Sequence, residues 1–167
     1  MKKHLNKILI GVSLLFAAVA IILLVAPGIT LKSEYEALTA MGVEKSYSMA
    51  NITFGHSMEV AEGISVEIFK FSFPNLLTYI LIAGGMVSAV LALLGKGGKI
   101  VSFVAAGLFL VGGVLYLCAG KLLVLAGEDS GMYTIGIGSI LGGVFSILAA
   151  CSAACTAILP MFLKTNE

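Results

Sequence analysis

The chain has 167 residues, of which 59% are hydrophobic and 11% charged, and its mean hydropathy is +1.09. This composition excludes a water-soluble domain, because such a chain could not cover its surface with polar atoms. The net charge of +1 excludes little as a total, so the information lies in how the charges are distributed.

Four long apolar runs divide the chain, at residues 8–26, 75–94, 100–120 and 132–163. A helix needs about 20 apolar residues to cross a bilayer core of ~30 Å. We therefore predict a single four-span membrane domain over residues 1–167. Its spans lie at about 7–26, 75–95, 100–126 and 132–160, and the segments between them are 27–74, 96–99 and 127–131.

The charged residues separate into two groups on opposite sides of these spans. The two ends and the 96–99 loop carry six lysines against one glutamate, whereas residues 27–74 and 121–131 carry four lysines against eight acidic residues. Lysine excess in short flanking segments marks the cytoplasmic side. We predict a plasma-membrane protein with both termini in the cytoplasm. The first run is longer than the ~7–15 residues of a signal-peptide core, which favours an uncleaved helix.

The first outer segment, 27–74, has a composition typical of a soluble fold. Ser33 and Glu36 fit a helix capping box, so we predict a short helix over 34–41 that stops at Gly42. Stretches 45–54 and 64–73 read as strands joined by a turn at 55–57. The third span is expected to continue to Ala126, and the fourth to begin near Tyr133. The predicted fold class is an all-α membrane protein, a four-helix transmembrane bundle with a small extracellular β-sheet and a short helix in the first outer loop.

Small residues recur at a spacing of four within the spans. In lipid, helices associate through close backbone approach at such residues rather than through hydrophobic burial. We expect packing within one bundle, with a face toward another protein as the alternative. The predicted helix-packing residues are Gly84, Ser88, Ala92, Gly138, Gly142 and Ser146.

Transport and enzyme chemistry lack the residues that they need. No ionisable side chain lies in the middle of a span, which disfavours proton-coupled carriers, pumps and voltage sensors. Three residues of the first outer segment, His56, Glu59 and Glu62, form a weak candidate metal site, with a solvated turn as the alternative. Cys151 and Cys155 share one helix face, and packing is the alternative to a redox or metal pair. We predict no catalytic residue, no metal ligand and no cofactor.

The layout is similar to that of claudin-type four-span proteins, with inside termini, a long first outer loop with strand character and a short second one. The loop motif of that family is a Trp followed by Gly-Leu-Trp and two Cys. This chain has no Trp, and its predicted outer loops contain no Cys. The resemblance is one of layout alone and implies no function.

The first functional hypothesis is a non-enzymatic accessory, adaptor or structural subunit that binds another protein through its outer segment or its helix faces. The alternatives are a small oligomeric transporter or pore subunit and a membrane enzyme with a minimal site. The expected partners are membrane lipid and another membrane or extracytoplasmic protein, or a second copy of the chain. The acidic balance of residues 32–70 argues against nucleic acid. Candidate partner-binding residues are Tyr47, Phe54, Phe69 and Phe71.

Overall fold

The computed structural model describes residues 2–61, 64–125 and 131–162. Most of these residues are helical, and four helices are long and apolar enough to cross a membrane, as the apolar runs predict. They are α1 (Lys2–Ile22), α3 (Phe73–Leu93), α4 (Gly98–Leu117) and α6 (Ile137–Phe162). The predicted end of the third span at Ala126 and most of the predicted 127–131 loop lie outside the described residues.

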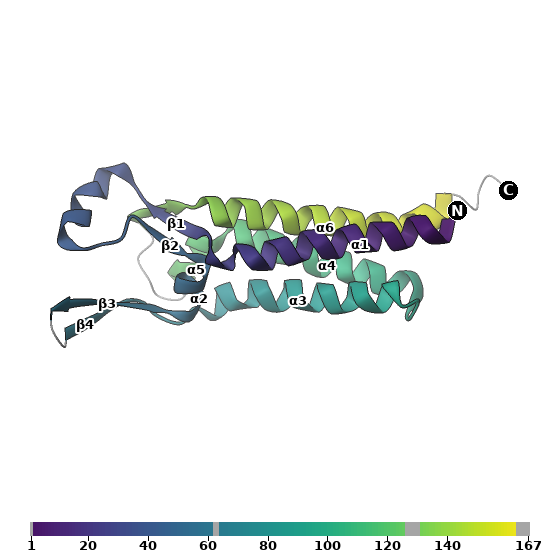
Figure 1. Cartoon of the computed structure of the whole chain (residues 1–167), viewed down its shortest axis with the longest axis horizontal. Helices are drawn as coiled ribbons and strands as arrows, with labels where there is room; N and C mark the ends of the chain where they lie inside the picture. Colours follow the sequence, from purple (N-terminus) through teal and green to yellow (C-terminus); the bar gives the residue numbers. More distant parts are fainter. Residues whose placement is uncertain (1, 62–63, 126–130, 163–167) are drawn as a thin grey trace.

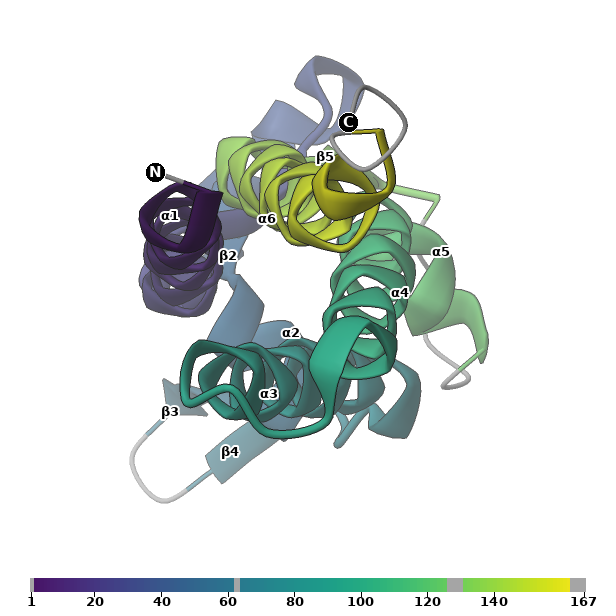
Figure 2. The same cartoon turned by 90° about the vertical axis from the view of Figure 1, so that its right-hand side faces the viewer.

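The four long helices run side by side (Figure 1). Seen along their axes, they form a ring in the order α1, α6, α4 and α3 (Figure 2). Helix α6 packs most extensively, against α4 and α1, whereas α1 and α3 are the neighbours with the least contact. Helix α1 begins and α6 ends at the same end of the bundle.

At the opposite end the chain forms a compact body that we call the β lobe. It consists of β1 (Pro27–Leu31), η2 (Ser33–Met41), β2 (Ser46–Ser48), α2 (Met49–Phe54), β3 (His56–Ala61), β4 (Ile64–Phe69) and β5 (Tyr133–Ile135). A short 3-10 turn, η1 (Leu23–Val25), leads into it from α1, and α5 (Ala119–Leu125) follows α4 after a break at Cys118. The sequence predicted one helix continuing past Gly120, and this is wrong, because the helix breaks at Cys118 into α4 and α5.

The β lobe contains two small sheets rather than the single sheet predicted. In the first, β1 lies between β2 and β5 and is antiparallel to both; in the second, β3 pairs with β4 as a hairpin. The fourth long helix was expected to begin near Tyr133, but Tyr133 opens strand β5 and α6 begins at Ile137. Strand β5 thereby ties the segment before α6 to the first sheet.

The predicted strand over 45–54 is wrong for most of its length. Only Ser46–Ser48 is extended, and α2 follows, because the Ser48 hydroxyl accepts a hydrogen bond from the Asn51 N–H at 3.1 Å and caps a new helix. The buried residues of α2 are Met49, Ile52 and Thr53, a helical spacing. The predicted turn at 55–57 shrinks to Gly55, whose φ of 94° ends α2, and β3 begins at once.

The predicted short helix is present as the 3-10 helix η2, and Gly42 ends it with a φ of 94°. The capping box, however, is wrong. The residue that precedes the helix is Lys32, and no side chain caps it. Glu36 instead pairs with Lys45 at 2.5 Å, which lowers the pKa of the Glu36 carboxyl and raises that of the Lys45 ammonium.

Close helix contacts depend on α6. A Cβ atom on Gly142 would collide with the Tyr116 ring of α4, and one on Gly138 would lie 2.7 Å from the Pro27 carbonyl oxygen. On α3 the close approach is made by Gly85, which faces the Phe109 ring, and not by Gly84. The other expected packing residues of α3, Ser88 and Ala92, are half-buried.

Hydroxyl groups also join the helices by hydrogen bonds to backbone carbonyl oxygens. Ser146 of α6 donates to the Phe109 carbonyl oxygen of α4 at 2.7 Å. Two bonds link α1 and α6: Ser13 donates to Ala149 O and Ser152 donates to Leu9 O, both at 2.9 Å. The Tyr116 hydroxyl of α4 donates to Ala20 O of α1 at 3.0 Å, so one bond also crosses the ring of helices.

We predict that Gly142→Ala destabilises the protein by about 1–3 kcal/mol, because the added methyl group must displace a buried ring that is itself hydrogen-bonded. Thermal unfolding in detergent micelles measures the effect. Gly107→Ala is the matched control, since nothing lies within 4 Å of a Cβ atom at Gly107, and its change should stay within about 1 kcal/mol. Equal stabilities of the two variants would contradict the packing.

We further predict that Ser146→Ala lowers the free energy of unfolding by about 0.6–1.7 kcal/mol, the range measured for hydrogen bonds between helices in lipid. The control is Ser88→Ala, because the Ser88 hydroxyl bonds to Gly84 O within its own helix at 2.9 Å. Reversible unfolding with a denaturing detergent provides the comparison. A larger loss in the Ser88 variant would refute the linking role of Ser146.

Candidate interaction surface

The β lobe is held together by rings packed around Tyr47. The Tyr47 ring lies 4.8 Å from Phe69, 5.4 Å from His56 and 5.9 Å from Tyr133, between ring centroids, in edge-on contacts. These residues come from β2, β4, β3 and β5, so the cluster joins the two sheets. Tyr47 and Phe69 are buried, and their rings are covered by this chain's own residues.

Burial of this cluster changes the acidity of its tyrosines. It raises the pKa of Tyr133 to about 12 and also raises the pKa of Tyr47. The main cause is the cost of placing a phenolate where water is partly excluded. For Tyr133, an unfavourable electrostatic interaction of its phenolate with Tyr47 adds a smaller contribution. Both hydroxyl groups therefore stay neutral at physiological pH.

Hydrogen bonds fix the β lobe to the ends of the helices. The Ser139 hydroxyl of α6 donates to Gly28 O of β1 at 2.7 Å, and the Asn75 amide of α3 donates to Ile52 O of α2 at 3.4 Å. Ser72 caps α3 by accepting from the Asn75 N–H at 3.4 Å. The lobe is therefore positioned by the same helices that form the bundle.

Large exposed rings gather where the lobe meets α3. Phe54, Phe71 and Phe73 are 56%, 54% and 59% exposed, so two of the four predicted partner-binding residues, Phe54 and Phe71, lie at the surface. The other two, Tyr47 and Phe69, lie in the core of the lobe. Exposed phenylalanines at this density mark a surface that contacts lipid or another protein.

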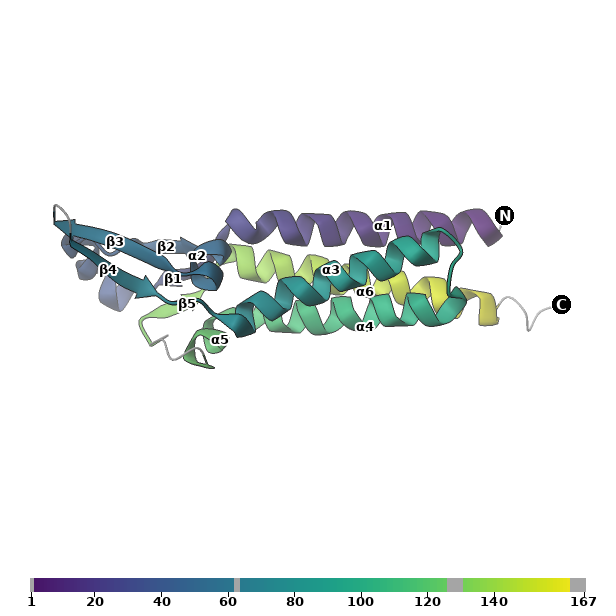
Figure 3. The same ribbon diagram turned by 90° about the horizontal axis from the view of Figure 1, so that it is seen from below.

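The β3–β4 hairpin extends beyond the ends of the long helices (Figure 3). Ser57, Glu59, Ser65 and Glu67 are exposed and share one face, with Ser57 opposite Glu67 and Glu59 opposite Ser65. The other face is apolar, with Met58 opposite Val66. The predicted strand over 64–73 is present as β4, but β4 ends at Phe69, and the last residue of the predicted strand, Phe73, begins α3. Strand β3 was not predicted, and its first two residues fall in the predicted turn at 55–57.

The candidate metal residues do not gather. His56 faces Glu44, with Nε2 3.8 Å from Oε1, and Glu59 lies further along β3; Glu62 is outside the described residues. Within residues 2–61, 64–125 and 131–162, no three His, Cys, Asp or Glu side chains lie together as a metal ion requires. In the part of the chain that the structure describes, these residues contribute exposed charge to the lobe surface rather than a metal site.

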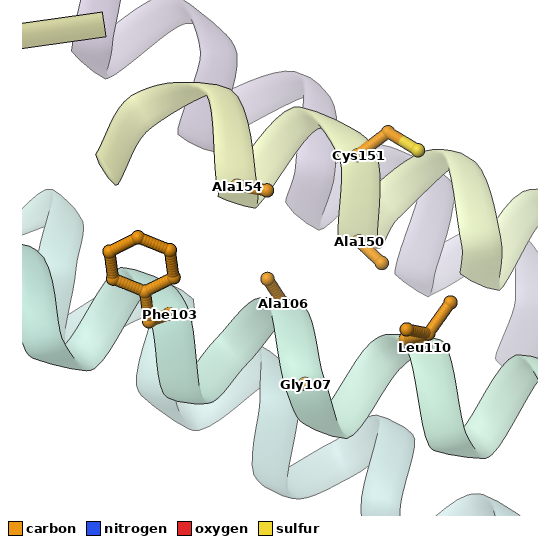
Figure 4. A pocket seen from close by; sticks show the side chains of 7 residues that line it. All are labelled: Phe103, Ala106, Gly107, Leu110, Ala150, Cys151 and Ala154. Atoms are coloured by element: carbon orange, nitrogen blue, oxygen red, sulfur yellow. The ribbon is translucent and has the colours of Figure 1, made fainter. Parts of the chain in front are cut away.

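A groove lies between α4 and α6 (Figure 4). This groove of about 320 Å³ is lined by Phe103, Ala106, Gly107, Leu110, Ala150, Cys151 and Ala154. All seven side chains are apolar or weakly polar, so the groove suits hydrocarbon. Cys151 and Cys155 are both exposed free thiols on α6, and Ala150 and Ala154 form the α6 side of the groove.

Comparison with known proteins adds no family assignment: the chain matches no protein-family model, and no curated protein matches its sequence.

Tyr133 is the lobe residue that sequence reasoning missed. Strand β5 has three residues, too few for an alternating pattern to stand out from the apolar run that follows it.

We predict that alkaline pH destabilises the β lobe through Tyr133. An unfolded tyrosine ionises near pH 10, and the raised pKa of the folded state keeps the proton bound to about pH 12. The stabilisation is complete below about pH 10 and is lost as the pH rises toward 12. Tyr133→Phe should flatten this decline in unfolding temperature, measured by circular dichroism, whereas Tyr35→Phe, at an exposed ring of η2, should not. Identical pH profiles for Tyr133→Phe and the parent protein would contradict the assignment.

Proposed function

We propose that this protein is a non-enzymatic integral membrane protein of the plasma membrane, an accessory, adaptor or structural subunit. It binds another protein through the β lobe, which lies on the outer side, while both termini lie in the cytoplasm. The observation that carries the proposal is the contrast between the two halves of the molecule. The helices present apolar side chains, whereas the lobe combines a fixed core with a projecting hairpin and exposed aromatic and acidic residues.

The helical half supports the proposal because two of its spans contain no charged side chain. The spans α3 and α6, at Phe73–Leu93 and Ile137–Leu159, contain no Asp, Glu, Lys, Arg or His. The buried polar groups between the helices are serine, threonine, asparagine and tyrosine side chains, and most of them bond to backbone carbonyl oxygens. Hydrogen bonds of this kind hold helices together. The groups that make them are neutral, whereas coupling transport to an ion usually uses a charged group within the membrane.

The β lobe supports the proposal by its surface. Exposed aromatic side chains are the usual anchors of protein interfaces, and Phe54 and Phe71 provide two of them beside the base of the hairpin. The lobe residues 32–70 carry six glutamates against three lysines, which favours a neutral or basic partner surface.

The orientation has a direct test by cysteine labelling in intact cells. In a variant with Cys118, Cys151 and Cys155 changed to alanine, we expect Ser57→Cys to react with a membrane-impermeant maleimide. Lys96→Cys, at the opposite end of the molecule, should react only after the membrane is opened. Both positions are exposed, so access to the thiol is limited by the membrane alone. The reverse pattern would overturn the orientation.

The binding role is tested by removing the hairpin. Residues 57–67 are replaced with a glycine–serine linker of equal length, which keeps the core residue Phe69 and all four long helices. The parent protein is cross-linked in native membranes, and its stoichiometric partner is identified. We expect the hairpin variant to insert and unfold like the parent but to lose that partner.

A length-matched control places the same linker in the loop between α3 and α4, after Lys96, where it should leave partner binding intact. If the hairpin variant keeps the partner, binding lies on the helix faces and the proposal fails. Loss of the partner in both variants would equally contradict it.

A further inference from the structure

We infer that strand β4 is an open edge that accepts an extended segment of a basic partner protein as the third strand of the hairpin sheet. This inference rests on the proposed function and specifies its partner. Strand β4 pairs with β3 along one of its edges, and among the described strands none pairs with its other edge.

The two strands of the hairpin differ in their surroundings. On β3, His56 contacts the Tyr47 ring and lies near Glu44, and the Met58 side chain reaches Gly42. On β4, Phe69 also packs on the Tyr47 ring, but Ser65, Val66 and Glu67 beyond it are all exposed. This exposed part of β4 is accessible on the side away from β3, where every second residue turns its backbone N–H and C=O groups outward.

Proteins usually protect such an edge. Lysine, proline or a covering loop prevents an exposed strand from pairing with other chains. Strand β4 reads Ile-Ser-Val-Glu-Ile-Phe and contains neither lysine nor proline. A two-stranded sheet is also marginally stable in water, so a third strand would stabilise the hairpin as well as bind to it.

The side chains of the hairpin define the occupant. One face carries Glu59 and Glu67 with two serines, and the other carries Met58 and Val66. A third strand places alternate side chains on these two faces. The complementary segment therefore alternates basic and apolar residues, with a basic side chain beside Glu67 at the cross-strand distance of about 5 Å. A second copy of this chain fits poorly, because it would bring two acidic faces into one sheet.

The test uses the full chain in nanodiscs of neutral phosphatidylcholine, which give a cationic peptide no charged lipid to bind. The probe is a short fluorescent peptide of alternating lysine and valine, and anisotropy measures its binding. We expect saturable binding, weakened about tenfold by Glu67→Lys, which turns a cross-strand attraction into a repulsion. Glu34→Lys is the matched control, because it makes the same charge change at an exposed position on η2 and should leave the affinity unchanged.

Backbone pairing has its own control. The same peptide with every backbone amide nitrogen methylated keeps its charge but cannot donate a backbone hydrogen bond from either edge, and it should not bind. The inference is overturned if neither peptide binds, if the methylated peptide binds equally well, or if Glu34→Lys weakens binding as much as Glu67→Lys. Dimerisation of the chain that Val66→Pro abolishes would assign the edge to a second copy and also overturn it.

This outcome can be separated from that of the proposed function. If replacing residues 57–67 removes the natural partner while Glu67→Lys retains it, the β lobe still binds that partner, but not by addition of a basic strand. If the partner stays in both variants, the proposed function itself fails.

Discussion

Hydroxyl groups that donate to backbone carbonyl oxygens across helix interfaces are the interaction on which the rest of this structure depends. Lipid is as apolar as the helices, so burial alone does not hold them together. Ser146, Ser13 and Ser152 supply directional bonds from α6 to α4 and between α6 and α1. Each requires close backbone approach. Gly143 of α6 and Gly113 of α4 allow it beside Ser146, and small residues such as Ala149 and Ala153 allow it between α6 and α1. Helix α6 is accordingly the element that organises the bundle.

The β lobe depends on the same helix. Strand β5 directly precedes α6 and completes the first sheet, and Ser139 of α6 bonds to the backbone of β1. The contact between the Tyr47 and Phe69 rings then fixes β4 relative to the first sheet. The root of the hairpin is thus fixed relative to the helices, while its strands extend beyond them (Figure 1). A rigid root and a free edge are what a binding element needs, because ordering it on contact with a partner then costs little conformational entropy.

The two exposed features of the molecule differ in what they can recognise. The groove between α4 and α6 offers apolar side chains and a thiol, and hydrocarbon of any kind satisfies it. The hairpin offers backbone hydrogen-bonding groups, a regular alternation of faces and negative charge, which together discriminate between partners. We therefore assign the proposed recognition of a partner protein to the β lobe, which the helices hold in place.

Local patterns were enough to predict the four membrane-length helices, the end of η2 at Gly42 and the start of α3 close to residue 75, because hydropathy and a left-handed glycine act locally. The other features follow from contacts between segments that lie far apart in the chain. Residues 49–54 form a helix rather than a strand because Met49 and Ile52 then pack together against Gly28 of β1. Strand β5 exists because β1 offers it an edge. Tyr47 and Phe69, both candidates for partner contact, are buried because the two sheets meet there. Strand pairing and burial join residues far apart in the chain, and no local pattern records which segments will meet.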